Sequence, residues 1–239
     1  MKHDRHLTPL LEGVSFASAA MGYDKKVWLF GPQNPGDVVK VHVFLDAEIY
    51  LKRVGALGVL EEFCRSAGSV SSAYAFVSHG TMAERNRESL FHRPFCEFLC
   101  RELVPQLVSR TGMSERCSPG LLCGLSLTGL ASVMVAVYFP DVYPLIAAQS
   151  GAYWPEDGRI LRELENLHGS EAFYFDVGSE ETDREGEIWS QMEGVKAVVD
   201  ALRKQGRRSE FSVFEGGHDS DAWRRSLPAV LHWAQKSGI

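Results

Sequence analysis

The sequence lacks an excess of basic residues and lacks long apolar runs. Its 239 residues include 25 Lys and Arg against 31 Asp and Glu, a formal net charge of −6. Nucleic acid and anionic membranes are therefore not expected as main partners. No run approaches the roughly 20 apolar residues of a membrane-spanning helix. The first residues, MKHDRHLTPLLEG, contain no signal-peptide core, so we expect a cytoplasmic protein.

The cysteines do not form the pattern of a metal site or a disulfide framework. There are five, an odd number, and their spacing matches no zinc motif. We interpret them as free, largely buried thiols in a reducing compartment. The sequence thus predicts no metal and no cofactor. The five are Cys64, Cys96, Cys100, Cys117 and Cys123.

Short apolar strands alternate with amphipathic helices from about residue 38 onward, which predicts an α/β fold. Such alternation indicates a mostly parallel central sheet with helices on both faces. Residues 13–30 read as an antiparallel N-terminal ribbon, and the charged stretch 79–88 reads as a loop. We expect one domain over 1–239. The expected strands of the main sheet are 38–45, 73–77, 120–124, 143–150, 171–178 and 209–217.

The stretch GLLCGLSLTGLASV, residues 120–133, places Ser126 between an apolar strand and an amphipathic helix. A sharp strand-to-helix turn is where an α/β-hydrolase carries its nucleophilic serine, in the motif G-x-S-x-G. Here Thr128 occupies the second glycine position, and we predict ordinary helical φ and ψ for it. Gly124 would let strand and helix approach. The alternative role for Ser126 is a helix cap, which is common for serine.

His218 lies on two glycines after a strand near the C-terminus, a position suited to a general base for Ser126. The acid that would orient its ring is sought in FYFDVGSEETD, residues 173–183. We favour Glu181, three places after a glycine, with Glu180 and Asp183 as rivals. The order serine, acid, histidine is that of α/β-hydrolases.

An oxyanion hole requires backbone N–H groups that face the developing negative charge. The residue after the nucleophile, Leu127, should supply one donor. The other should follow the strand VHVFL, at Ala47 or its neighbour. Backbone donors leave almost no signature in side chains, so both assignments rest on position in the fold.

Several motifs resemble the enterochelin esterases and the wider esterase D and feruloyl esterase family. The run EGGHDSDAWRRSLPAVL is similar to their GGHD-x-x-x-W-R-x-x-L-P pattern, and GLSLTGLAS to their elbow. FLDA, ERNRESL and QSGAYW match further family stretches in the same order, so the resemblance covers roughly residues 38–235. It implies an α/β-hydrolase with Ser126 as nucleophile and His218 as base.

The resemblance also implies which residues line the substrate site. Arg85, with Tyr153 or Trp154, would border the acyl or alcohol side, and Arg85 or Arg87 would hold an anionic group. The alternatives are solvation at the surface for the arginines and core packing for Trp154.

The leading hypothesis is a metal-independent serine esterase acting on a small-molecule ester, siderophore-like or aryl. Acyl transfer or thioester hydrolysis at the same site is a second hypothesis. A non-catalytic binding protein of hydrolase fold is a third, and assembly into a homo-oligomer stays open.

Overall fold

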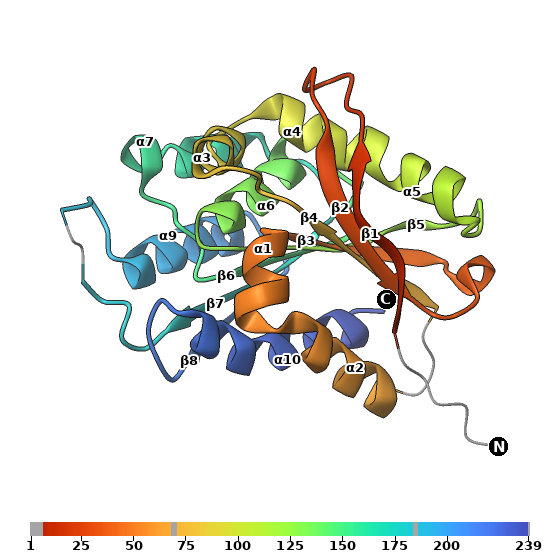
Figure 1. Ribbon diagram of the computed structural model, residues 1–239. Helices are drawn as coiled ribbons and strands as arrows, with labels where there is room; N and C mark the ends of the chain where they lie inside the picture. Colours follow the sequence, from red (N-terminus) through yellow and green to blue (C-terminus); the bar gives the residue numbers. More distant parts are fainter. Residues whose placement is uncertain (1–6, 68–70, 184–185, 239) are drawn as a thin grey trace.

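The computed structural model describes residues 7–67, 71–183 and 186–238. Its centre is an eight-stranded sheet in the order β1-β2-β4-β3-β5-β6-β7-β8 (Figure 1). Pairing is parallel from β4 to β8, whereas β1 and β2 join as an antiparallel ribbon. The α/β prediction and the N-terminal ribbon are therefore confirmed. The strands are β1 Thr8–Phe16, β2 Lys25–Gly31, β3 Lys40–Leu45, β4 Ser72–Val77, β5 Ser118–Leu125, β6 Leu145–Gln149, β7 Ala172–Gly178 and β8 Ser209–Phe214.

Helices cover both faces of the sheet (Figure 1). The face with α2 and α10 packs on one buried cluster, and the face with α4, α5, α6, α8 and α9 on the other. The α-helices are α1 Ala47–Ile49, α2 Ala56–Ala67, α3 Met82–Ser89, α4 Arg93–Glu97, α5 Leu103–Thr111, α6 Leu127–Tyr138, α7 Pro155–Gly158, α8 Ile160–Glu163, α9 Gln191–Lys204 and α10 Ser220–Lys236. Short 3₁₀ and π segments are η1 Pro35–Asp37, η2 Tyr50–Val54, η3 Phe98–Glu102 and η4 Leu164–Asn166.

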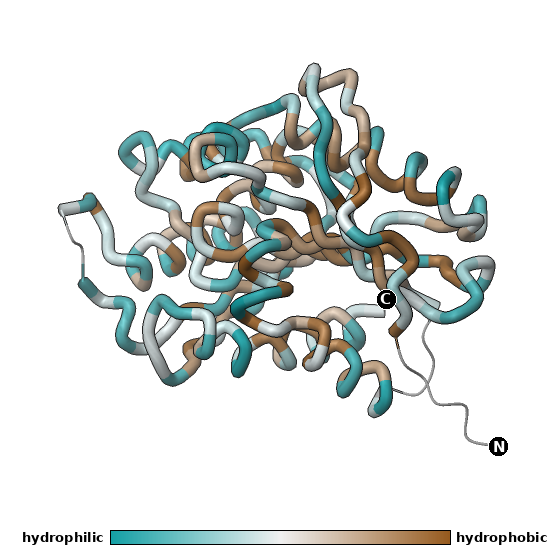
Figure 2. The backbone as a smooth tube through the Cα atoms, in the orientation of Figure 1, coloured by the Kyte–Doolittle hydropathy of each residue, from teal (hydrophilic) through white to brown (hydrophobic). Residues whose placement is uncertain are grey.

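The central strands are apolar on both faces because helices cover both sides. In β3, Val43 and Leu45 belong to the cluster under α6, whereas Phe44 belongs to the cluster under α10. This alternation follows from the two-residue period of a strand. Figure 2 shows the result, with hydrophobic segments gathered in the sheet and hydrophilic ones on the outer turns of the helices. None of the described helices has the length and apolar character of a membrane span.

The expected loop 79–88 is largely helical, and this part of the prediction is wrong. Thr81 and Glu84 form a capping box at the start of α3, with Glu84 N–H donating to Thr81 Oγ1 at 3.2 Å. The buried residues of α3 are Arg85, Glu88 and Ser89, so its inward face is polar. A pattern of apolar residues could not reveal such a helix, since ion pairs hold it against the sheet.

Close approach between β5 and α6 fixes the turn that contains Ser126. A Cβ atom on Gly124 would lie 2.1 Å from the carbonyl oxygen of Thr128, which only glycine avoids. A Cβ atom on Gly129 would lie 2.9 Å from Cα of Gly151 in the loop after β6. The expectation for Gly124 is confirmed, and Gly129 provides a second close contact one residue after the usual glycine position.

We expect Gly124→Ala to lower the free energy of unfolding by about 1–3 kcal/mol, because the added methyl group overlaps backbone atoms that cannot move independently. Gly58→Ala is the matched control, since a Cβ there meets no atom within 4 Å. Because Gly58 is an exposed position of helix α2, Gly58→Ala should raise the free energy of unfolding by up to about 1 kcal/mol. Urea denaturation measures both, and equal midpoints would contradict the steric argument.

Candidate active site

Ser126 occupies a sharp turn between β5 and α6, as the sequence predicts. Its backbone has φ 52° and ψ −124°, a conformation rare for residues with a side chain. Hydrogen bonds hold the turn: Ser126 N–H donates to Gln149 O at 2.9 Å, and Ser126 O accepts from Ala152 N–H at 2.9 Å. The strained turn directs the hydroxyl away from the sheet, toward the loops beyond the carboxyl ends of the strands.

Thr128 lies in the first turn of α6 without positive φ, which agrees with the prediction for this residue. Its hydroxyl is buried and accepts a hydrogen bond from Leu125 N–H at 3.0 Å. The same oxygen lies 2.9 Å from Oδ2 of Asp46, the residue that follows β3. Threonine therefore does more here than avoid a clash.

His218 lies in the loop between β8 and α10. Its Nε2 is 2.9 Å from Ser126 Oγ, so the two residues share a hydrogen bond although they are 92 positions apart. The edge of the Trp223 ring meets the imidazole at a centroid distance of 4.9 Å and an interplanar angle of 83°. Gly216 has φ 128°, which only glycine readily adopts, and lets the loop return toward Ser126.

Glu181 is the carboxylate that faces His218. Its Oε2 is 2.6 Å from His218 Nδ1, and its Oε1 accepts from Gly178 N–H at 2.7 Å and from Ser150 Oγ at 2.6 Å. The side chain is nearly fully buried. Hydrogen bonds on both oxygens hold the carboxylate in one orientation.

The other acidic residues of this stretch are placed differently. Glu180 and Asp183 are exposed, and within the described residues neither forms a hydrogen bond or ion pair with His218. Asp176 lies inside β7, under the site, and burial raises its pKa to about 7. The geometry therefore favours Glu181 over both rivals as the partner of the histidine.

The two predicted oxyanion donors begin helices on adjacent strand ends. Ala47 follows β3 as the first residue of α1, and Leu127 follows β5 as the first residue of α6. Strands β3 and β5 pair in parallel, with Phe44 opposite Cys123, so both donors lie at the same edge of the sheet. As first residues of helices, their N–H groups have no intrahelical acceptor and are available to a bound anion.

The three predicted substrate residues lie in different surroundings. Trp154 lines a pocket of about 360 Å³ together with His218. Tyr153 is completely buried, packs edge-on against Phe175 and does not line this pocket, so we assign it to the core instead. Burial raises the pKa of its hydroxyl well above the usual value.

Arg85 borders the site but is already paired. Its Nε and Nη2 bind both oxygens of Asp46 at 2.7–3.0 Å, and the pair is buried. A guanidinium group engaged in this way is not a free receptor for an anionic substrate. Arg87 is exposed and contacts Tyr23 through Nη2, at 2.8 Å from the hydroxyl. The anion-binding role predicted for these arginines therefore lacks support in the geometry.

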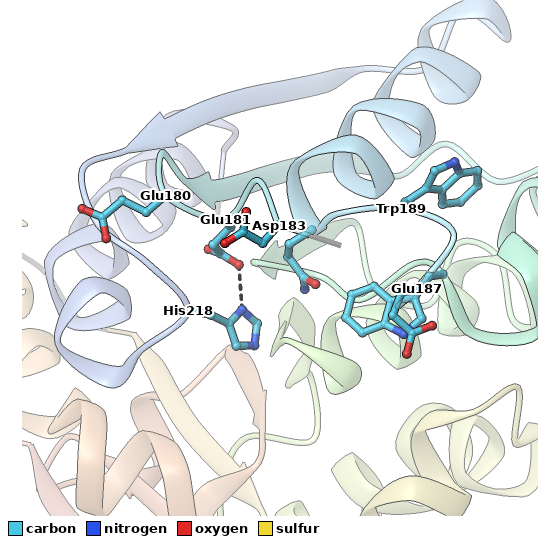
Figure 3. A pocket seen from close by; sticks show the side chains of 8 residues that line it. Glu180, Glu181, Asp183, Glu187, Trp189 and His218 are labelled. Carbon is cyan, nitrogen blue, oxygen red and sulfur yellow. Dashed lines mark hydrogen bonds and ion pairs between the residues drawn. The ribbon is translucent and has the colours of Figure 1, made fainter. Parts of the chain in front are cut away.

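Two pockets meet at His218. The first is lined by Trp154, Glu180, Glu181, Asp183, Glu187, Trp189, Gln191 and His218. Figure 3 shows Glu181 facing His218, with Glu187 and Trp189 farther along the pocket. The second, about 340 Å³, is lined by Ile49, Arg53, Arg85, Ser126, His218, Asp219, Ser220 and Trp223. A substrate bound at Ser126 can therefore extend to both sides of the histidine.

Sequence reasoning missed the residues that hold Glu181 in place through hydrogen bonds. Ser150 follows β6 with φ 46°, and its hydroxyl donates to Glu181 while accepting from Trp223 Nε1–H at 3.0 Å. The amide of Gln191 donates to the backbone oxygen of Ser150. The tryptophan was visible only as part of the motif after His218. Ser150 lies in the QSGAYW stretch, but its role left no sign there, because its partners Glu181, Gln191 and Trp223 are distant in sequence.

The sheet topology and a serine at a strained strand-to-helix turn define an α/β-hydrolase. Within that class, the family model described as "Putative esterase" matches residues 18–234, and the chain belongs to this family. This family assignment agrees with the resemblance that the sequence motifs indicated.

Individual relatives are distant. The iron(III) enterobactin esterase of Escherichia coli O6:H1 (strain CFT073) is 23% identical over 234 residues, covering 92% of this chain and 56% of the relative. A crystal structure of the Shigella flexneri enterobactin esterase in the presence of enterobactin superposes with a TM-score of 0.80. The two sequences are 18% identical, and the superposition covers 98% of this chain and 59% of the Shigella flexneri chain. A ferulic acid esterase superposes with a TM-score of 0.74 at 15% identity, covering 97% and 98%.

We expect Glu181→Gln to lower kcat/KM for p-nitrophenyl acetate by about 10²–10⁴-fold, because the amide removes the negative charge that orients and stabilises the imidazolium. Glu180→Gln and Asp183→Asn should each lower kcat/KM by less than about tenfold, since neither carboxylate is bonded to His218. Steady-state rates compare the three variants. A larger loss in either rival would reassign the acid.

Proposed function

We propose that the protein is a serine carboxylic-ester hydrolase that works through an acyl-enzyme on Ser126. The observation that carries this proposal is the continuous series of hydrogen bonds from Glu181 through His218 to Ser126, with distances of 2.6 and 2.9 Å. Such a series activates a hydroxyl that is otherwise a weak nucleophile. It also argues against a non-catalytic binding protein, which has no need for an aligned acid, base and nucleophile.

In the first half of the reaction, Ser126 Oγ attacks the ester carbonyl carbon while its proton moves to His218 Nε2. The carbonyl oxygen becomes an oxyanion and accepts hydrogen bonds from the amides of Leu127 and Ala47. Collapse of this intermediate breaks the bond to the alcohol oxygen, which takes the proton from His218. The alcohol leaves, and the acyl group stays on Ser126.

In the second half, water adds to the acyl carbon and gives one proton to His218 Nε2. The bond between the acyl carbon and Ser126 Oγ then breaks, Oγ regains the proton, and the acid is released. The Glu181 carboxylate orients the His218 ring and stabilises the imidazolium in both halves. The His218 side chain is 40% exposed, so water can reach its ring.

The substrate class that we infer is an aryl ester. Trp154 and Trp189 line the pocket beside His218, together with Glu180, Asp183 and Glu187, and aromatic side chains offer contact area to an aromatic ring. The ring would occupy this pocket, and the other part of the ester would extend into the pocket lined by Ile49 and Trp223. The named relatives are esterases of enterobactin and of ferulic acid, which agrees with a siderophore-like or aryl ester.

A fluorophosphonate probe should label the protein covalently, whereas Ser126→Ala should not be labelled, because the probe forms its bond to the serine oxygen. Wild-type enzyme should also release a burst of p-nitrophenol equal to the enzyme concentration if deacylation is slower than acylation. Stopped-flow absorbance and in-gel fluorescence measure these outcomes. Equal labelling of both proteins would exclude Ser126 as the nucleophile.

We expect Trp154→Ala to raise KM for methyl ferulate by roughly tenfold, since one aromatic contact contributes about 0.5–1.5 kcal/mol. Vinyl acetate has no ring, so its KM should change by less than about twofold on the same basis. Trp154→Phe keeps an aromatic face and should give an intermediate value. KM for each substrate is measured by pH-stat titration of the acid that the reaction releases. An equal effect on both esters would show that Trp154 does not bind the ring.

A further inference from the structure

We propose that Thr128 is a positioning residue that holds the oxyanion hole in shape through the carboxylate of Asp46. This inference rests on the proposed function and extends it to residues that do not touch the substrate. Thr128 stands where the G-x-S-x-G motif has glycine, and glycine has no hydroxyl. The contact between Thr128 and Asp46 therefore depends on a residue by which this chain differs from the motif.

Asp46 controls the direction of one oxyanion donor. It directly precedes Ala47, so its ψ angle sets the orientation of the peptide plane that carries the Ala47 N–H. Its backbone is left-handed, with φ 68° and ψ 55°, and the residue is 1% exposed. A left-handed conformation is unfavourable for most residues that carry a side chain. The surrounding contacts must offset this cost for the turn to persist.

Two side chains hold the Asp46 carboxylate. Arg85 donates from Nε and Nη2 at 2.7–3.0 Å, and Thr128 Oγ1 lies 2.9 Å from Oδ2. The single hydroxyl hydrogen of Thr128 has two acceptors at 2.9 Å, Asp46 Oδ2 and Leu125 O. The ionised carboxylate is the stronger acceptor, so it is the preferred one. All three side chains are at least nine-tenths buried, where such bonds are little weakened by water.

The bond between Thr128 and Asp46 joins the two loops that supply the donors. Thr128 adjoins Leu127, the donor on α6, and Asp46 adjoins Ala47, the donor on α1. Leu125 N–H donates to the same hydroxyl at 3.0 Å, which fixes the oxygen relative to the last residue of β5. One hydroxyl group thus sets the spacing between the two N–H groups. Arg85 alone would hold Asp46 but would not tie it to α6.

The test compares Thr128→Val, which has nearly the same shape but no hydroxyl, with Thr128→Ser, which restores it. Thr128→Gly is a second variant, because glycine is the usual residue of the motif at this position. Thr111→Val is the matched control, since the Thr111 hydroxyl bonds only Leu107 O within helix α5. Each variant is assayed for kcat and KM with p-nitrophenyl acetate and for the inhibition constant of an aryl trifluoromethyl ketone.

The ketone adds to Ser126 as a hemiketal. A bond forms between Oγ and the carbonyl carbon, the proton passes to His218, and the former carbonyl oxygen becomes an oxyanion in the hole. Its inhibition constant therefore reports the hole itself, whereas KM for a ground-state ester does not. Loss of a whole donor costs about 10²–10³-fold, so a misplaced donor should cost roughly 10–100-fold.

We expect Thr128→Val and Thr128→Gly to lower kcat and raise the inhibition constant by the same factor, with little change in KM. Thr128→Ser and Thr111→Val should keep values close to wild type. The proposal is overturned if Thr128→Val or Thr128→Gly keeps wild-type kcat, if kcat falls without a matching rise in the inhibition constant, or if Thr128→Ser is as impaired as Thr128→Val. Ser126→Ala in the same assay separates the two levels: full activity there would overturn the serine mechanism itself.

Discussion

The turn of the backbone at Ser126 is the constraint on which the active site depends. Its φ of 52° brings the hydroxyl within 2.9 Å of His218 Nε2, and it places Leu127 at the start of α6. The turn exists because Gly124 and Gly129 let β5, α6 and the loop after β6 approach more closely than side chains would permit. Close packing in the core thus accompanies the strained conformation, and hydrogen bonds from Ser126 N–H to Gln149 O and from Ala152 N–H to Ser126 O maintain it. The position of this serine therefore depends on packing as much as on its hydrogen bond to His218.

Local patterns were enough to predict Ser126 and His218, because each follows a recognisable strand and carries glycines that signal a tight turn. The sheet could be predicted for the same reason. Glu181 could be favoured but not separated from its neighbours by sequence, since the difference lies in which carboxylate is turned inward by Gly178 and Ser150. The pairing of Arg85 could not be predicted, because its partner, Asp46, is 39 positions away and gives no local sign of the contact. Helix α3 was missed because its buried face consists of charged and polar groups.

The matched family segment, residues 18–234, contains every side chain of the proposed mechanism. The chain spans only 56% of the length of the enterobactin esterase of Escherichia coli but 98% of the length of the ferulic acid esterase chain. Both solved structures superpose on nearly the whole of this chain, so they share its fold. In this protein the pockets beside His218 carry Trp154 and Trp189 on one side and Arg53 on the other.

The position of His218 after the edge strand has a consequence for folding. Ser126 follows β5, Glu181 follows β7, and His218 follows β8, the last strand to join one side of the sheet. No two of these residues are close in sequence, so the site cannot form from local structure. Contacts of this kind are slow to form, since the chain loses conformational entropy before they contribute. The hydrogen bonds that link Glu181, His218 and Ser126 should therefore form only when β8 has paired with β7, so that they report assembly of the sheet edge rather than early collapse.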